Sequence, residues 1–180
     1  MIRTLTFLKS SLVLVLLSTL FVSCEEKKKE RPSPLREEHT EFKDGQLKIV
    51  YSSPSVTSPD GENRHGHIWG QLVPYDSIWR TGANDATYFQ TDVDLQIHGQ
   101  SLASGSYALF TIPTKNEWQV ILNEEWNQWG SYNYDSTLDA ARLRVVPKVS
   151  DEFSERMRFY FEEDSLKFHW EYLSFSLALE

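Results

Sequence analysis

The stretch that decides the fold is Tyr107-Ala108-Leu109-Phe110-Thr111-Ile112-Pro113, followed beyond the polar residues 114–117 by Trp118-Gln119-Val120-Ile121-Leu122. Both runs are short and rich in β-branched and aromatic residues. Turn residues bound them, with Ser104-Gly105 before the first run and Pro113 after it. Such a pattern predicts two antiparallel strands joined by a tight turn.

Alternating runs recur on both sides of this hairpin. Towards the N-terminus they are Leu47–Tyr51, Thr87–Thr91 and Val93–Ile97, with a tight turn at 98–100. Towards the C-terminus they cover 139–146 and 157–161, and then Leu166, Phe168, Trp170 and Tyr172, continuing after Leu173 through Phe175, Leu177 and Leu179. About eight short strands without a convincing helix predict an all-β fold, either an antiparallel β-sandwich or a jelly-roll-like domain.

Two segments fit neither the helical nor the strand period. Residues 52–66 are rich in Ser, Pro, Asn, Asp and Gly, which predicts a long loop. Residues 124–135 carry Trp126, Trp129, Tyr132 and Tyr134 around Gly130, and we interpret them as an aromatic loop.

The first 23 residues have the form of a secretory signal peptide. Arg3 and Lys9 precede an apolar run over 11–22, which is shorter than the roughly 20 residues of a membrane-spanning helix. Ser23-Cys24 at its end resembles a bacterial lipobox, although Phe21 departs from the usual Leu. We therefore expect Cys24 to become the acylated first mature residue, carrying palmitate-type chains that bind membrane lipid. The alternative is a free thiol in an ordinary cleaved signal peptide.

Three parts of the chain follow from this interpretation. Residues 1–23 are the lipoprotein signal peptide, 24–41 are a disordered tether, and 42–180 are a single β-sandwich domain. The tether is predicted because 25–38 are charged with almost no apolar side chain to bury. The expected location is the cell envelope, with the chain lipid-anchored to a bacterial outer membrane and facing the periplasm or the cell surface.

Composition excludes several classes of function. A formal net charge of -8 argues against a nucleic-acid partner, because phosphate binding needs a basic patch. The sequence contains no Gly-x-Ser-x-Gly, no Gly-x-Gly-x-x-Gly and no P-loop, so it offers neither a nucleophile elbow nor a phosphate cradle. No cofactor is predicted.

Five motifs follow one another in order: Ile68-Trp69-Gly70-x-Leu72-Val73-Pro74-Tyr75, Trp79-Arg80-Thr81-Gly82-Ala83-Asn84-x-Ala86-Thr87, Gly105-x-Tyr107-x-Leu109-Phe110-x-Ile112-Pro113, Trp118-x-Val120-Ile121-Leu122-Asn123, and Trp129-Gly130-x-Tyr132-x-Tyr134-Asp135. With them the chain resembles the bacterial domain-of-unknown-function family number 2911 over roughly residues 33–180. That family occurs in secreted proteins and lipoproteins of Gram-negative bacteria. The resemblance implies a β-rich extracytoplasmic domain and no particular activity. The His65-Gly66-His67 sequence departs from the basic residue that family members tend to have there, so it is particular to this chain.

The segment 79–84 is the candidate ligand site. Aromatic faces stack on sugar rings, while Arg and Asn supply forked hydrogen bonds. The candidate residues are Trp79, Arg80, Thr81 and Asn84, joined by Trp129 and Tyr132 from the aromatic loop, and the expected partner is a carbohydrate or another small ligand. The alternative is structural, with Trp79 filling the core, Arg80 bridging loops and Asn84 capping a turn.

An enzyme is the less favoured hypothesis. His65 and His67 would lie on one side of an extended segment and bind a metal, but no local Glu completes the ligand set, which leaves a solvated loop as the alternative. Asn133, Asp135, Thr137 and Asp139 alternate like calcium-loop oxygens without the central Gly, so a turn is the preferred interpretation. Carboxylate pairs assembled from distant strands remain open, with Asp85, Glu117, Glu124 and Glu125 as candidates. A purely structural envelope lipoprotein is the third hypothesis.

Overall fold

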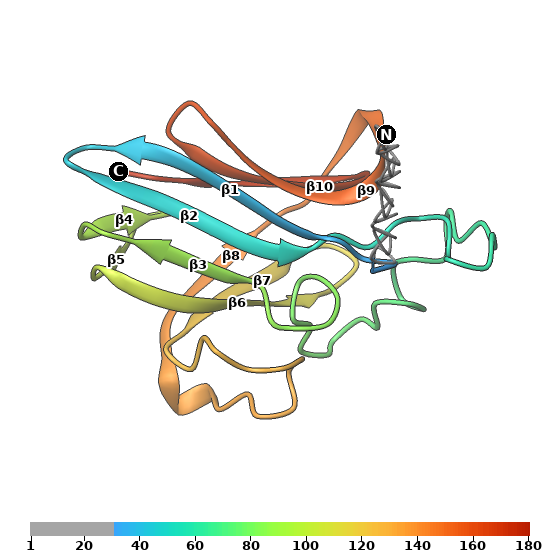
Figure 1. Cartoon of the computed structure of the whole chain (residues 1–180), viewed down its shortest axis with the longest axis horizontal. Coiled ribbons are helices and arrows are strands. Elements are labelled where there is room, and N and C mark those ends of the chain that lie inside the picture. Colours follow the sequence, from blue (N-terminus) through green and yellow to red (C-terminus); the bar gives the residue numbers. More distant parts are fainter. Residues whose placement is uncertain (1–30) are drawn as a thin grey trace, which may run out of the picture.

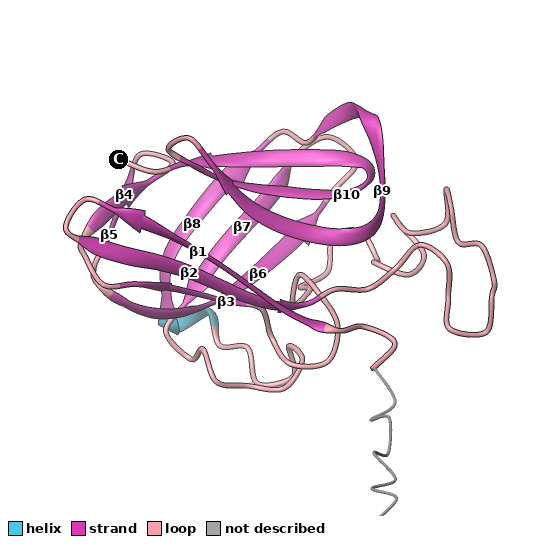
Figure 2. Ribbon diagram, turned by 45° about the horizontal axis from the view of Figure 1, so that its top comes forward, coloured by secondary structure: helices cyan, strands magenta, loops and turns pink. Residues whose placement is uncertain are grey.

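The computed structural model describes residues 31–180, and its regular secondary structure is antiparallel β-strand apart from one 3₁₀ turn (Figure 2). In chain order its elements are β1 (Leu35–Phe42), β2 (Gly45–Ser52), β3 (Tyr88–Thr91), β4 (Leu95–Ile97), β5 (Gln100–Leu102), β6 (Gly105–Pro113), β7 (Trp118–Asn123), the 3₁₀ turn η1 (Ser136–Leu138), β8 (Asp139–Val145), β9 (Lys148–Glu162) and β10 (Ser165–Ala178). The prediction of an all-β, antiparallel, sandwich-like fold is confirmed.

Six strands form the main sheet, in the order β1-β2-β3-β6-β7-β8. The hairpin that the sequence singles out lies within it, pairing Ala108–Pro113 of β6 with Trp118–Asn123 of β7. Both strands are buried along nearly continuous runs rather than on alternate residues. A strand shows that pattern when both faces of its sheet are covered.

The β9–β10 hairpin covers one face of this sheet (Figure 1). β9 runs beside the edge strand β1, and β10 lies near the other edge strand, β8. The core between the layers holds inward-facing residues of both, including Ile49, Phe89, Leu109, Trp118, Phe159 and Phe168. Burial of these large side chains is the main source of stability in a domain that has no disulfide.

Two long loops supply cover for the opposite face. A smaller cluster there contains Ala108, Phe110 and Ile121, and Ile78 and Tyr134 pack onto it from the loops. Phe110 meets the Tyr134 ring edge-on at 5.2 Å between centroids. The aromatic loop over 124–135 therefore serves in part as a lid on the second face of the sheet.

The segment between β2 and β3 is a long excursion that returns to the sheet at Trp79. Gly70 has a φ of +83° and closes a tight turn, and a Cβ at this position would lie 2.7 Å from the Tyr75 ring. Trp79 then exchanges two backbone hydrogen bonds with Thr111 of β6, at 2.8 and 2.9 Å. The segment 79–84 is thereby fixed beside the main sheet.

One boundary predicted from the sequence is wrong. The sequence predicts a disordered tether over 24–41, but Leu35–Phe42 form β1 and pair with β2 along their whole length. β1 is an edge strand whose side chains stay exposed or half-buried, so it is held by backbone pairing and carries little apolar signal. The signal peptide over 1–23, Cys24 and the tether up to residue 30 lie outside the described residues. Between residues 31 and 180 no helix is long and apolar enough to cross a membrane.

Candidate functional site

A cleft of about 370 Å³ opens beside the segment 79–84. We call it the Arg80 cleft. Its walls come from the loop after β2, from residues 72–83, from Ser131 of the aromatic loop and from Trp170 of β10. No acidic side chain lines it. Its volume falls within the ~300–1,000 Å³ range of small-molecule sites.

Arg80 is the distinctive residue of this cleft. Its side chain is half-buried, and its Nε is fully buried without a hydrogen-bond partner among the described residues. No described carboxylate forms an ion pair with it, since the five salt bridges within residues 31–180 involve other residues. Burial lowers the pKa of the guanidinium, and nearby Tyr132 opposes that effect. Because an arginine stays charged in proteins, this is a partly desolvated cation without a protein counterion.

Two tryptophans form an apolar wall of the cleft. Trp79 and Trp170 stack with ring centroids 6.1 Å apart and planes at 23°, and they are 8% and 1% exposed. The Trp79 Nε1 donates to the Gly82 carbonyl at 3.1 Å. The Trp170 Nε1, by contrast, is buried and lacks a partner among residues 31–180. Buried donors of this kind are normally satisfied by protein, water or a bound group.

A second arginine in the cleft behaves differently. Arg64 donates from Nε to the Val56 carbonyl at 3.1 Å and from Nη2 to the Ser55 carbonyl at 2.7 Å. These bonds tie the loop together, so Arg64 is a structural residue of the cleft wall. Arg80 is the arginine left available to a ligand.

Trp129 and Tyr132 form an exposed aromatic platform next to the cleft. Their rings stack at 5.7 Å with planes only 7° apart, and they are 60% and 80% exposed. The Gly130 N–H donates to the Asn84 carbonyl at 3.1 Å, which ties the platform to the segment 79–84. Ser131, between the two aromatics in the chain, lines the cleft itself. The structure thus brings Arg80, Trp129 and Tyr132 into one region, although neither aromatic side chain lines the cleft itself.

Thr81 and Asn84 have structural positions instead. Thr81 is fully buried with a φ of +49°, and its hydroxyl lies 3.1 Å from that of Thr111. Asn84 has a φ of +59°, a conformation that Asn tolerates better than most residues. Neither lines the cleft. Trp79 is mainly a core residue, as the structural alternative proposed, although its edge lines the cleft.

The two histidines do not share a site. Gly66 adopts a φ of +75° in a turn, so the segment is not extended. The His65 Nδ1 lies 2.8 Å from Oε1 of Glu171, whereas the His67 Nδ1 lies 2.9 Å from the Gln71 amide. Within residues 31–180 no cluster of three or more His, Cys, Asp or Glu side chains could hold a metal. The predicted metal pair therefore gains no third ligand.

The carboxylates of the segment that resembles a calcium loop accept hydrogen bonds from other groups of the protein. Asp135 caps η1 by accepting from the backbone N–H of Thr137 at 2.9 Å. Asp139 accepts from Asn123, from Tyr134 and from Arg142. A turn rather than a calcium site is what the segment forms.

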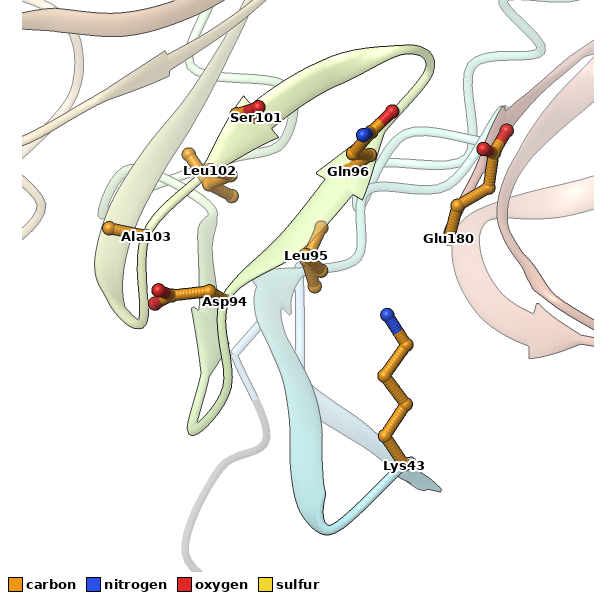
Figure 3. Close-up of a pocket in the computed structure, with 8 residues that line it drawn as sticks. All are labelled: Lys43, Asp94, Leu95, Gln96, Ser101, Leu102, Ala103 and Glu180. Carbon is orange, nitrogen blue, oxygen red and sulfur yellow. The ribbon is translucent and has the colours of Figure 1, made fainter.

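Among the carboxylates held open for catalysis, Glu117 forms an ion pair with Arg144 at 3.2 Å. Asp85 forms an isolated antiparallel β-bridge with Trp129. Another hollow, of about 520 Å³, lies at β4, β5 and the C-terminal residue (Figure 3). Figure 3 shows Lys43 reaching towards Leu95 while the Asp94 carboxylate points away from it, and no predicted site residue lines this hollow.

Sequence reasoning missed Trp170, Arg64 and Ser131 as parts of the cleft. The sequence pattern places Trp170 in a strand, and only tertiary packing brings it against Trp79. Arg64 and Ser131 lie in polar loops, and nothing in the composition of these loops predicts that they form the wall of a cleft.

The sequence model of one family, described as "Protein of unknown function (DUF2911)", matches residues 33–179. No curated protein and no solved structure matches the chain. The match covers most of the chain and includes every residue of the cleft except Pro32.

Proposed function

The chain belongs to the DUF2911 family, whose description assigns no activity, and on that premise we propose that it is a binding module for glycans that carry an acidic group. The Arg80 cleft takes the acid, and the Trp129–Tyr132 platform takes neighbouring sugar rings.

The observation that carries this proposal is the unpartnered guanidinium of Arg80 in a cleft without acidic side chains. A desolvated cation is costly unless it is paired, and a carboxylate is the geometric match for the guanidinium fork. Trp170, whose buried N–H also lacks a partner among residues 31–180, lines the same cleft. The platform adds stacking surface, which suits the apolar face of a pyranose ring.

A purely structural role fits this geometry less well. A structural arginine would be satisfied by backbone carbonyls or carboxylates, as Arg64 is. Arg80 makes no such bond within the described residues.

Titration calorimetry with trigalacturonate tests the proposal, with its methyl ester as the uncharged match. The wild type should bind the acid and bind the ester at least about tenfold more weakly, since hydrogen bonds to charged groups contribute about 1.5–3 kcal/mol. Arg80→Met should remove that preference, and Tyr132→Ala should weaken both ligands. Equal affinity of the wild type for acid and ester, or no binding of either, would overturn the proposal.

We further propose that the module is held at the cell envelope by acylated Cys24. The support is the apolar run over 11–22 ending at this single cysteine. Detergent phase partition and labelling with radioactive palmitate test it. The wild type should enter the detergent phase and carry label, and Cys24→Ala should do neither. Labelling that survives the substitution would contradict the anchor.

A further inference from the structure

The seam between the edge strand β8 and the β9–β10 hairpin holds a second concave site, which shares no lining residue with the Arg80 cleft. It encloses about 560 Å³ and takes its walls from β8, β9 and β10, with His98 from the β4–β5 turn. β8 and β10 lie near each other but are not paired as neighbouring strands of a sheet. The seam therefore lies between the two layers of the sandwich and not on the surface of one pair of hydrogen-bonded strands.

The charges along this seam have one sign. Its walls carry the cations Arg144, Lys148 and Lys167, together with His98, and no acidic side chain lines it. The chain as a whole has a formal net charge of -8, so this concentration of cations runs against the overall balance. Ser174, Ser176 and Tyr160 add hydroxyl groups to the same walls.

Two of the cations already have carboxylate neighbours outside the seam. Arg144 pairs with Glu117 at 3.2 Å and Lys167 pairs with Glu162. In both pairs the carboxylate is well exposed, and exposed pairs typically contribute no more than ~1 kcal/mol. A ligand anion enclosed by the seam can compete with such pairs. Lys148 has no ion-pair partner among the described residues.

The backbone of β8 adds a donor. The Gln100 side chain bonds both the N–H and the carbonyl of Arg142, which shows that these groups point away from β7. Backbone groups alternate along a strand, so those of Arg144 point to the same free edge. Outside the strand ladders, no backbone group within residues 31–180 accepts from the Arg144 N–H.

The floor of the seam is apolar. Val145, Phe168 and Phe175 lie there, and all three are buried core residues. A small inorganic anion would leave this floor uncovered, whereas a ligand with an apolar body would cover it. The volume also exceeds what phosphate alone needs and lies within the ~300–1,000 Å³ range of organic ligands.

We infer that the β8 seam binds amphiphilic carboxylates of the fatty-acid class. The carboxylate lies against Lys148, Lys167 and the Arg144 N–H, and the alkyl chain lies over the apolar floor. This site is independent of the proposed glycan cleft.

The test is calorimetric titration of the wild-type protein with butanoate, hexanoate and octanoate, and with acetate and 1-octanol as matched ligands lacking the chain or the charge. Affinity should rise about fourfold per added CH₂ as apolar surface is buried. Acetate should not bind, and 1-octanol should bind at least about tenfold more weakly than octanoate. Octanol as tight as octanoate, or affinity independent of chain length, would overturn the inference.

Variants locate the site. Lys148→Gln is at an exposed position and should retain the fold, and together with Lys167→Gln it should weaken octanoate binding about tenfold or more. Lys115→Gln, in the exposed β6–β7 turn, is the control and should leave binding unchanged. Arg80→Met should also leave it unchanged, which separates this site from the glycan cleft. Equal loss in Lys115→Gln and in Lys148→Gln would show a non-specific charge effect and refute the seam as the site.

Discussion

Replacing Arg80 by Met should stabilise the unliganded protein. The buried Nε has no acceptor among the described residues, and leaving such a group unsatisfied costs about 1–3 kcal/mol. Methionine keeps most of the apolar stem and removes the charge. Only Nε lacks both solvent and a partner, so we expect the lower end of that range, a gain of about 1 kcal/mol in the free energy of unfolding. For a chain of this size that corresponds to a rise in Tm of about 2–4 °C.

Arg64→Met is the matched control, because both arginines line the same cleft. Arg64 donates to two backbone carbonyls, so its loss should lower the free energy of unfolding by about 1.5–3 kcal/mol. Urea denaturation of wild type and both variants, without ligand, measures the two signs. If Arg80→Met destabilises the protein as much as Arg64→Met does, Arg80 is a satisfied structural residue and the reasoning is wrong.

Three other variants probe the scaffold. Glu171→Ala removes the buried acceptor of His65 and of the Gly66 N–H, and should lower the free energy of unfolding by about 1–3 kcal/mol in urea; a change below 0.5 kcal/mol would mean that this contact does not hold the loop. Burial, with a carboxylate acceptor, raises the pKa of Tyr134 to about 12, so the native state keeps a proton that the unfolded chain loses above pH 10. Stability should therefore fall between pH 10 and 12, and Tyr134→Phe should flatten that fall; an unchanged slope would contradict the assignment. Trp118→Ala should cost about 3–5 kcal/mol because the side chain is fully buried, whereas the same change at exposed Trp129 should cost less than ~1 kcal/mol, and similar costs at both positions would contradict the layer assignment.

The strands that the sequence predicts best are those with buried apolar side chains along most of their length. Tyr107–Pro113 and Trp118–Leu122 are clear because their apolar side chains report the core directly. β1 and the first half of β9 carry mostly exposed side chains and are held by backbone pairing, which leaves no apolar period to detect.

The sequence of the C-terminal strand β10 indicates a bulge, because its apolar alternation is interrupted. The large apolar residues occupy even-numbered positions up to Tyr172 and odd-numbered positions from Leu173 onwards. The structure has register irregularities between His169 and Leu173, with Glu171 at a φ of +52°. Such a bulge turns a side chain to the other face, and here it buries the Glu171 carboxylate against the loop after β2.

The sequence predicts some residues of the candidate site and not others, because tertiary packing decides which side chains are accessible. Arg80 and the aromatic platform stand out by residue type. Thr81 looks equally suitable as a ligand contact, but whether a hydroxyl is available depends on its tertiary partner, which is Thr111 on a distant strand. Trp170 joins the cleft only because the hairpin packs across the sheet.

The most direct test of the central claim follows the Nε–Hε resonance of Arg80 in ¹H–¹⁵N spectra, assigned by its disappearance in Arg80→Met. Trigalacturonate should shift this resonance, because its carboxylate would bind the same guanidinium and change the charge around Nε. The methyl ester should leave it where it is. A resonance that stays unchanged while trigalacturonate binds elsewhere would contradict the assignment of Arg80 as the acid-binding residue.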